Sequence, residues 1–498
     1  MFKKIFYFFV FAFLGLIAVI LFNTFTFESK QLDVPKAEAV EFPETSLQHF
    51  RQAIQFKTIS WEDTAMFDPE PFLQLHQFLA ATYPLADSLL EKTVVNDLSL
   101  LYEWKGSDPL LKPIVLMGHM DVVPIEKPQD QIEFERRVGK LKSEMYSTWE
   151  VPPFAGEMKD GYVWGRGTID DKVSVIGNLE AVERLLQEGF QPKRTVYFAF
   201  GHDEEIGGVK GAKAIVDILK AKNVVPEFVM DEGGIITKEK VPGLLVPVAL
   251  VGTAEKGFVT IELTINLPGG HSSMPQKETS IEVLAKAILA LRENQFPTEI
   301  TPPVQAFLDR IGPEMPFGQK MVFANLWLFE GVIKGIYEGS PAGNASVRTT
   351  TSPTIFNSGF KANVLPSEAK AIVNFRVLPG QSSEEVMARV KEVIADDRIG
   401  LAFSGKIDEA TQVSPINSFG YEVITKTIRQ HFDETIVTPY LVVGATDARY
   451  YYELTDNVYR FMPVTDPIGF HDINERISVD SYYQALNYYY NLIKNSSE

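Results

Sequence analysis

The chain has 498 residues, of which 45% are hydrophobic and 22% are charged. These proportions are those of globular proteins, and they exclude wholesale disorder and a polytopic membrane protein. The 47 Lys and Arg residues against 65 Asp and Glu residues give a net charge of −18, which argues against a nucleic-acid partner. The absence of cysteine excludes disulfides, thiolate catalysis and iron–sulfur clusters.

The first elements in the chain are a basic tip and an apolar segment. Residues 5–22 carry no charge and follow Lys3 and Lys4. A helix of that length is ~27 Å long, close to the hydrocarbon thickness of a bilayer. The two lysines orient the amino terminus toward the cytoplasm. The residues after Phe22 are bulky, which disfavours signal-peptidase cleavage, although a cleaved signal peptide is the competing interpretation.

We therefore predict a retained, single-pass signal anchor. Residues 1–4 form a cytoplasmic tip, residues 5–22 span the membrane, and residues 23–44 form a tether rich in Ser, Lys, Pro and Glu. The catalytic part is expected outside the cytoplasm, in a periplasmic, extracellular or lumenal space.

From about residue 45 to 255, apolar strands alternate with helical stretches. The expected strands are 114–117, 195–200 and 228–230, and residues 174–187 have apolar side chains at helical spacing. Such alternation predicts an α/β domain with a mainly parallel sheet.

The pattern changes at residue 256. Residues 256–413 combine alternating strands at 258–265 and 370–377 with helices at 281–291 and 383–395. This indicates a smaller α+β unit of the ferredoxin-like, split βαβ type. Residues 414–498 return to the α/β pattern and end on an aromatic-rich helix at 482–493.

Five polar segments carry the candidate chemistry. They are Gly118-His119-Met120-Asp121, the segment 165–172 with Asp170, Asp203-Glu204-Glu205, Asp231-Glu232-Gly233-Gly234, and the segment 470–475 with His471. Those that follow a strand are expected at the carboxyl edge of the sheet, where α/β proteins bind ligands. Each segment alone is a weak signal. Together they supply two imidazoles and several carboxylates, enough for two metal ions that share one bridging ligand. Nitrogen and oxygen ligands suit zinc first, with manganese or cobalt as alternatives.

The order and spacing of these segments resemble the co-catalytic dizinc metallopeptidase family of aminoacylase, carnosinase and glutamate carboxypeptidase. The similarity is greatest to the branch of carboxypeptidase S and N-fatty-acyl-amino-acid synthase/hydrolase, and it extends from about residue 45 over nearly all of the remaining chain. It implies two Zn²⁺ per subunit, with metal ligands at His119, Asp170, Glu205, Asp231 and His471. Asp170 would bridge the ions, and a cis peptide would follow it. Glu204 would be the proton shuttle, and Asp121 would orient His119.

The resemblance also assigns residues outside the metal cluster. His271, in a Gly-Gly-His-Ser-Ser motif, would stabilise the oxyanion of the scissile carbonyl. Asn363 and Arg376 would form a clamp for a substrate carboxylate, with Gly444 in a glycine-containing loop near it. The aromatic residues of the insert between 296 and 356, such as Phe317, Phe323 and Trp327, either line an acyl pocket or pack the insert's own core, and we prefer the second interpretation.

The domain organisation follows from the positions of the implied metal ligands in the sequence. Four precede residues 256–413 and one follows them, so the catalytic domain is expected in two parts (45–255 and 414–498) around an inserted lid. The lid is also the expected place for a homodimer contact. The implied function is metal-dependent hydrolysis of an amide bond next to an amino acid with a free carboxylate, in a peptide or an N-acyl amino acid. The alternatives are a dipeptidase of the same family and a non-catalytic ectodomain on the same fold.

Overall fold

The computed structural model describes residues 2–125 and 149–497 and divides into two compact units. Met1, the first residue of the predicted cytoplasmic tip, lies outside the described residues. Unit 1 comprises Met1–Ser29, Ala254–Val413 and Pro439–Ala445, and unit 2 comprises Lys30–Thr253, Ser414–Thr438 and Thr446–Glu498. Each unit is described on its own below.

A nine-stranded sheet lies mainly in unit 2, and parts of its last two strands belong to unit 1. Its main path runs β1 (Glu91–Val95), β2 (Ser99–Trp104), β6 (Val196–Gly201), β3 (Ile114–His119), β7 (Phe228–Asp231), β17 (Val458–Arg460), β9 (Val248–Glu255) and β16 (Ile436–Val442), and β8 (Ile236–Thr237) pairs with β9. The pairs β6–β3, β3–β7 and β7–β17 are parallel, whereas β1–β2, β2–β6 and β17–β9 are antiparallel. The α/β class is thus confirmed, with the parallel pairs at the centre of a mixed sheet.

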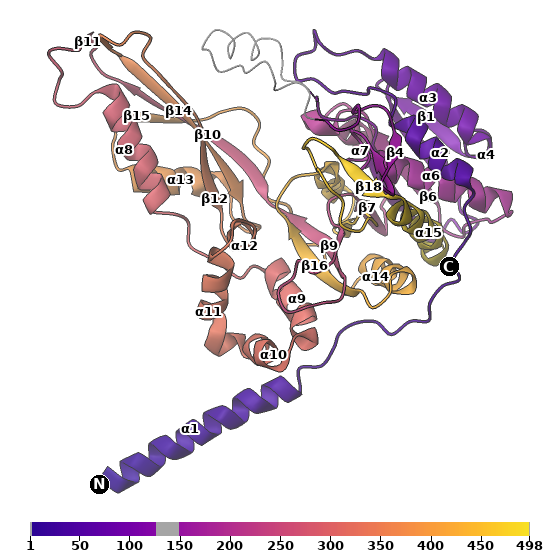
Figure 1. Cartoon of the computed structure of the whole chain (residues 1–498), viewed down its shortest axis with the longest axis horizontal. Coiled ribbons are helices and arrows are strands. Elements are labelled where there is room, and N and C mark those ends of the chain that lie inside the picture. The colour runs from indigo at the N-terminus through magenta and orange to yellow at the C-terminus, as the bar shows by residue number, and fades with distance from the viewer. Residues whose placement is uncertain (1, 126–148, 498) are drawn as a thin grey trace. The chain divides into compact units, whose positions relative to one another are not determined.

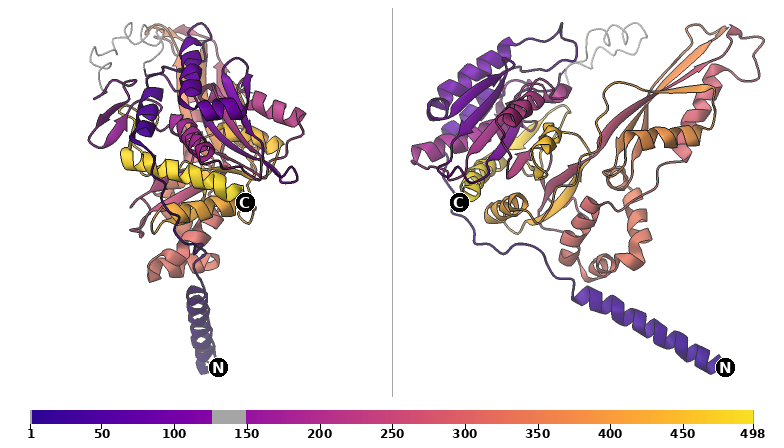
Figure 2. Two further views of the ribbon diagram at one scale, coloured as in Figure 1. Left: turned by 90° about the vertical axis from the view of Figure 1, so that its right-hand side faces the viewer. Right: turned by 180° about the vertical axis from the view of Figure 1, so that it is seen from behind.

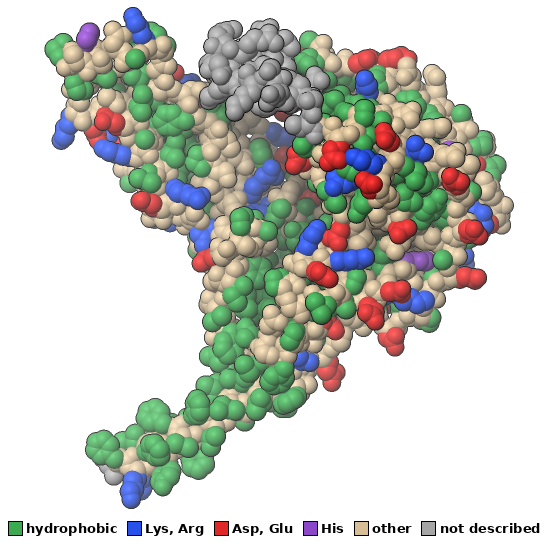
Figure 3. All heavy atoms as spheres, viewed as in Figure 1, with side chains coloured by type: hydrophobic (Ala, Val, Ile, Leu, Met, Phe, Trp, Pro, Cys, Tyr) green, Lys and Arg blue, Asp and Glu red, His purple; other side chains and the backbone are tan. Residues whose placement is uncertain are grey.

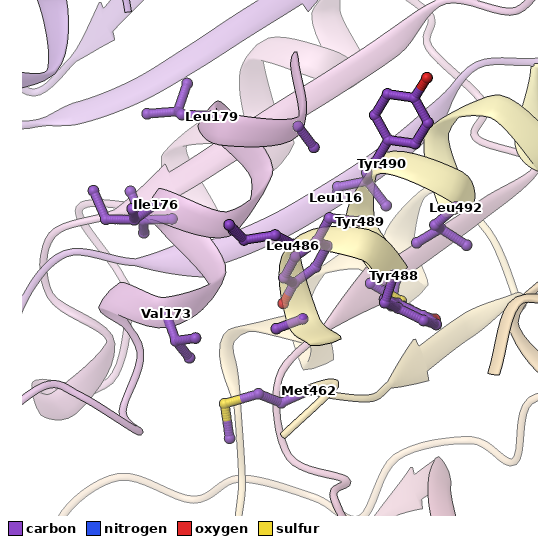
Figure 4. Close-up of a cluster of buried hydrophobic side chains, with 14 of the residues drawn as sticks. Leu116, Val173, Ile176, Leu179, Met462, Leu486, Tyr488, Tyr489, Tyr490 and Leu492 are labelled. Carbon is purple, nitrogen blue, oxygen red and sulfur yellow. The ribbon is translucent and has the colours of Figure 1, made fainter. Parts of the chain in front are cut away.

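Helices cover both faces of this sheet. Ile114 and Leu116 of β3 belong to the core beneath α6 (Lys172–Gln187) and α15 (Val479–Ser496), and Figure 4 shows side chains of these elements packed together. Val115 and Met117 point to the other face and pack with α7 (Ala212–Ala221) and η3 (Asp447–Glu453). Because successive strand residues point to opposite faces, a continuous apolar run indicates burial on both sides. The first face also carries α2 (Glu44–Ala53), α4 (Pro84–Leu89) and α14 (Phe419–His431), whereas α3 (Glu70–Thr82) contacts α2 and α4. A separate three-stranded sheet joins β4 (Glu157–Lys159), β5 (Tyr162–Trp164) and β18 (Arg476–Ser478).

Unit 1 is built on a four-stranded antiparallel sheet. The strand order is β12 (Thr350–Ser358), β14 (Glu368–Val377), β10 (Gly257–Asn266) and β15 (Ile399–Phe403). Helix α8 (Ser280–Glu293) follows β10 and helix α13 (Ser383–Ile394) follows β14, and their apolar side chains share one core with the sheet. Both helices begin with a capping box, from Thr279 and Ser382 respectively, which stabilises their first turns. This order of strands and helices is ferredoxin-like.

Four further helices lie between α8 and β12 where the sequence is rich in Pro and Gly. They are α9 (Pro302–Ile311), α10 (Phe317–Ala324), α11 (Leu326–Glu338) and α12 (Pro341–Val347), with the 3₁₀ turn η2 (Gly312–Glu314) after α9. Pro302 and Pro341 occupy first-turn positions, where the missing N–H costs no hydrogen bond. Phe323 packs against the helices' own small core, as we preferred, whereas Phe317 and Trp327 are exposed.

The amino-terminal segment forms helix α1 (Phe2–Phe25), which has a mean hydropathy of 2.9 in its most apolar window. It projects from the α10 end of unit 1 (Figures 1 and 2). Part of the predicted tether is held on unit 2 rather than free. The Gln31 side chain bonds the backbone of Val437, Lys36 pairs with Asp433, and the Val40 backbone bonds Asn487.

A candidate metal centre at the carboxyl edge of the sheet

Three neighbouring strands deliver acidic and histidine side chains to one edge of the unit 2 sheet. Strand β3 ends at His119, β6 is followed by the 3₁₀ turn η1 (Glu204–Ile206), and β7 ends at Asp231 just before Glu232. Because β3 lies parallel to both β6 and β7, the three ends meet at the same edge. This is the arrangement that the sequence pattern indicated.

Asp170 lies between two histidines from distant parts of the chain. One carboxylate oxygen, Oδ1, lies 2.7 Å from His119 Nε2, and the other, Oδ2, lies 2.5 Å from His471 Nε2. The Asp170–Asp171 peptide bond is cis, as the resemblance implied. A carboxylate that presents one oxygen to each of two imidazoles has the form of a bridging ligand.

Each histidine has a second carboxylate beside it. Glu205 Oε2 lies 3.4 Å from His471 Nε2, and Glu232 Oε1 lies 3.4 Å from His119 Nε2. The cluster therefore has two halves that share Asp170: His119 with Glu232, and His471 with Glu205.

Asp231, the residue expected as a ligand, uses one of its carboxylate oxygens for a backbone hydrogen bond. Its Oδ2 accepts the backbone N–H of Ala448 at 2.8 Å. Adjacent residues at a strand end point to opposite faces, so Asp231 reaches the 446–448 turn while Glu232 reaches His119. Glu232 is the functional candidate that sequence reasoning missed. The acidic pair was visible, but its sequence does not say which member faces the histidine.

Asp121 connects the His119 ring to the Glu204 turn. Its Oδ1 lies 3.2 Å from His119 Nδ1, the ring nitrogen on the far side from Asp170. The same carboxylate accepts the backbone N–H groups of Glu204 and Glu205 at 3.2 and 3.1 Å, and the Ser60 hydroxyl at 2.6 Å. A partner of this kind fixes the ring angle and the tautomer of a ligating histidine.

Glu475 holds the Asp170 loop in place. Its buried carboxylate accepts the backbone N–H groups of Gly167 and Ile169 at 3.0 and 2.8 Å and pairs with Arg166 at 2.7 Å. Since Glu475 is four residues beyond His471, one side chain ties together the two loops that carry Asp170 and His471.

The charges in this cluster favour a cation. Burial raises the pKa of Glu232 well above its usual value, and the neighbouring Asp170 raises it further. Burial and Asp170 together raise the pKa of Glu205 to about 7. Among the described residues, Glu232 Oε2 is buried without a hydrogen-bond partner. Carboxylates that repel one another in a buried site, beside imidazoles, fit the donor set of a divalent transition metal.

Comparisons with known proteins show the family of this chain. Residues 115–495 match the model of Peptidase family M20/M25/M40. The chain belongs to this family. It is 40% identical to probable carboxypeptidase S-like 2 of Dictyostelium discoideum and 38% identical to the N-fatty-acyl-amino acid synthase/hydrolase PM20D1 of Xenopus tropicalis, each over 97% of this chain and 93% of the relative. Its fold is similar to that of the M20 family metallo-carboxypeptidase Sso-CP2 from Sulfolobus solfataricus, with a TM-score of 0.65 at 17% identity over 91% of this chain and 99% of the other.

The predicted family and reaction class are thereby confirmed. This M20 protein is a metal-dependent hydrolase of amide bonds. Two groups of side chains in the described part of the chain are close enough to hold a metal ion, namely His119 with Asp170 and Glu205, and His119 with Asp171 and Glu232. Glu204, the predicted proton shuttle, belongs to neither group. Burial raises its pKa well above the usual value.

The remaining predicted residues of the M20 hydrolase lie in unit 1. Strand β11 (Gly270–His271) pairs with β13 (Val364–Leu365), and the Ser272 N–H donates to Asn363 O at 3.3 Å. His271 and Asn363 are therefore neighbours, and both are exposed. Gly444 follows β16 and has open space around it.

Arg376 lies apart from His271 and Asn363 within unit 1. It sits near the far end of β14, eight residues beyond the first residue of that strand, which corresponds to ~26 Å along a strand. It is half-buried with its guanidinium 4.7 Å from the Phe258 ring, and burial lowers its pKa. Unit 1 thus does not assemble Asn363 and Arg376 into one clamp.

Proposed function

We propose that this M20 hydrolase cleaves the amide bond of an N-acyl amino acid, or of the last residue of a peptide, by attack of a water that Glu204 deprotonates. The observation that carries the proposal is the placement of Asp170, with one oxygen facing His119 and the other facing His471 at 2.7 and 2.5 Å. This arrangement suits two cations that share one carboxylate.

The donor set supports two zinc ions per subunit, with manganese or cobalt as alternatives. His119, Glu232 and Asp170 would hold one ion, and His471, Glu205 and Asp170 the other. Glu232 thus takes the ligand role that the resemblance implied for Asp231. Bound ions would acidify a shared water and polarise the scissile carbonyl.

The protein's own groups supply the proton transfer. Glu204 accepts the proton of the attacking water and returns it to the leaving amine, which requires a carboxylate that is not itself a ligand. Its raised pKa brings its basicity closer to that of a proton acceptor working near neutral pH. Asp121 keeps the His119 ring oriented through Nδ1. His271 donates a hydrogen bond to the developing oxyanion.

The substrate class follows from the relatives and from Arg376. Relatives named carboxypeptidase S-like and N-fatty-acyl-amino acid synthase/hydrolase act, by their names, on substrates that contain an amino acid. A half-buried guanidinium suits bidentate binding of the free carboxylate of such a substrate. We assign this contact to Arg376. His271 and Asn363 lie at the other end of the unit 1 sheet. They act together on a substrate that is bound in the same or a neighbouring subunit. Unit 1 serves as the lid and as the dimer contact. Gly444 lines the pocket that binds the substrate carboxylate.

We also propose that α1 is a retained signal anchor. Its 24 residues and mean hydropathy of 2.9 suit a membrane span, and Lys3 and Lys4 orient it with both units outside the cytoplasm.

The test is hydrolysis by the zinc-loaded full-length protein in detergent micelles. The substrates are N-acyl amino acids of increasing acyl length, dipeptides, and the methyl ester of each. We expect amide cleavage of the free acids and a large rise in KM for the esters, because the esters lose the charge that Arg376 binds. Equal amide cleavage of acids and esters would contradict the carboxylate requirement. Cleavage of dipeptides alone would make the protein a dipeptidase.

A further inference from the structure

We propose that an exposed apolar face of α11 lies in the lipid interface of the membrane that α1 crosses. The inference rests on the proposed role of α1 as a membrane anchor, and it adds a second, lateral contact with the bilayer. The α11 apolar face consists of Trp327, Leu328, Gly331, Val332, Gly335 and Ile336.

The α11 apolar face forms one continuous arc of the helix. At 100° per residue these six positions fall within about half of the helix circumference, and none of them is charged. Trp327 is 60% exposed, Val332 54% and Ile336 65%. A Cβ added at Gly331 or Gly335 would meet no atom within 4 Å. The opposite side of α11 carries Ile333, which is buried in the core of the helical insert.

Of the charged residues of α11, Glu330 and Lys334 lie outside this arc, whereas Glu338 lies within its angular range at the last residue of the helix. Glu330 and Lys334 form an ion pair at 2.6 Å, and Glu338, at the carboxyl end of the helix, pairs with Arg348. The helix therefore has an exposed apolar side, an opposite side that packs in the core of the helical insert, and an ion pair at the edge of the exposed side. An exposed apolar helix face with charged residues at its edge is typical of a helix that lies in the plane of a membrane interface.

The start of α11 is attached to the carboxyl end of α1. Asn325, which separates α10 from α11, accepts a hydrogen bond from the Asn23 side chain at 2.9 Å and donates one to Ile20 O at 3.2 Å. The rings of Phe25 and Phe317 lie 5.9 Å apart. The apolar face thus begins two residues from the point where α1 meets the rest of unit 1.

This attachment sets the depth of α11. A helix of 24 residues is ~36 Å long, and the hydrocarbon layer is ~30 Å thick. The last turn of a spanning α1 therefore reaches the headgroup region, and Trp327 lies at that level. Trp side chains favour this region, because the ring is apolar and its N–H can bond water or headgroups.

The alternative occupants of the face are another protein and a second copy of this chain. The bilayer is favoured because the apolar surface is continuous with α1: Figure 3 shows hydrophobic side chains covering α1 and continuing onto the adjoining part of unit 1. A surface that extends an anchor helix at headgroup depth is covered by lipid without any partner. Such docking would hold the enzyme at the layer into which long-chain N-acyl amino acids partition.

The chain contains no cysteine, so single cysteines can be labelled without background. We would introduce Val332→Cys and Ile336→Cys separately into the full-length protein, attach a nitroxide, and reconstitute each variant in phospholipid nanodiscs. Collision with oxygen, which concentrates in lipid, and with a nickel chelate, which stays in water, then reports the environment. Leu289→Cys on α8 is the matched control, because Leu289 is also an exposed apolar residue of a unit 1 helix, at 55%. Val10→Cys in α1 reports the anchor itself.

We expect the labels at 332 and 336 to lose nickel accessibility and gain oxygen accessibility relative to the label at 289, and the label at 10 to be deeper still. Labels at 332 and 336 as accessible to nickel as the label at 289, with the label at 10 in lipid, would overturn the inference and leave the anchor intact. A label at 10 in water would overturn both. Spin–spin broadening at 332 or 336 would show that a second copy covers the face and would also overturn the inference.

Discussion

The Asp170 cluster of unit 2 and the His271–Asn363 pair of unit 1 differ in how firmly the surrounding structure holds their side chains. The cluster around Asp170 is fixed by the fold: Asp121, Glu475 and the Ala448 N–H each hold a ligand or its neighbour by hydrogen bonds. By contrast, His271 and Asn363 lie on a two-residue strand pair with exposed side chains. The candidate metal centre is therefore preorganised, whereas we expect His271 and Asn363 to gain their environment from substrate or a partner surface. Changes at the centre should therefore act on kcat and metal content, whereas a change at Arg376, which binds the substrate carboxylate in our proposal, should act on substrate binding.

The largest effect is expected from Glu204→Gln. Removal of the proton acceptor should lower kcat by about 10²- to 10⁴-fold, while zinc content stays unchanged because Glu204 is no ligand. Kinetics together with zinc measurement by atomic absorption check this. The control is Glu91→Gln, which changes an exposed glutamate of β1 that pairs with Lys105 and should leave kcat unchanged. Near-normal turnover of Glu204→Gln would remove its assigned role.

The second test separates the two adjacent acidic residues. Glu232→Gln should lower zinc content and reduce kcat by on the order of 10²- to 10³-fold, because a metal supplies several kcal/mol of stabilisation. Asp231→Asn should retain both metals, since its oxygen accepts a backbone N–H that an amide oxygen can also accept. Loss of zinc from Asp231→Asn but not from Glu232→Gln would restore the original assignment.

Glu475→Gln tests whether the metal centre is held by its surroundings. We expect zinc affinity to fall by about 10- to 100-fold, because Asp170 and His471 lose their common support. Zinc affinity is measured by competition with a chromophoric chelator. Since Arg166 would be left without its carboxylate, the melting temperature is measured in parallel with zinc in excess. A folded variant that binds zinc as tightly as the parent would show that Glu475 has no positioning role.

Arg376→Ala tests the proposed carboxylate contact in unit 1. Loss of a charge-assisted contact should raise KM by roughly 10- to 100-fold for substrates with a free carboxylate and leave kcat and zinc content nearly unchanged. Arg398→Ala is the matched control, because Arg398 is an exposed unit 1 arginine that pairs with Asp396 and Glu278. Steady-state kinetics that show the same KM for both variants would exclude Arg376 from carboxylate binding.

Zinc binding should also depend on pH. Hydrogen bonding to Asp170 raises the pKa of His471 to about 10 in the metal-free centre, and burial raises that of Glu205 to about 7. Both groups must lose a proton to bind zinc. Apparent affinity should therefore rise with pH, by about one order of magnitude per pH unit for each proton released, and more steeply below pH 7 than above it. Affinity that is constant from pH 6 to 8 would contradict this coupling.

The sequence predicted those parts that depend on local pattern. The ends of β3, β6 and β7 could be located because apolar runs are followed by polar clusters, and these ends hold His119 and Glu204. The choice between Asp231 and Glu232 needed coordinates, since the strand end determines which residue faces His119. The separation of Arg376 from Asn363 was hidden for a similar reason, because it depends on the length of β14. The sequence did not predict helices α9–α12, because Pro and Gly generally disfavour helices, although Pro302 and Pro341 here begin them.

The most direct test of the metal centre is anomalous X-ray diffraction at the zinc edge from crystals of the zinc-loaded protein. We expect two zinc peaks on either side of the Asp170 carboxylate, one beside His119 and Glu232 and the other beside His471 and Glu205. A single peak, or a second zinc ion that Asp170 does not contact, would contradict this expectation.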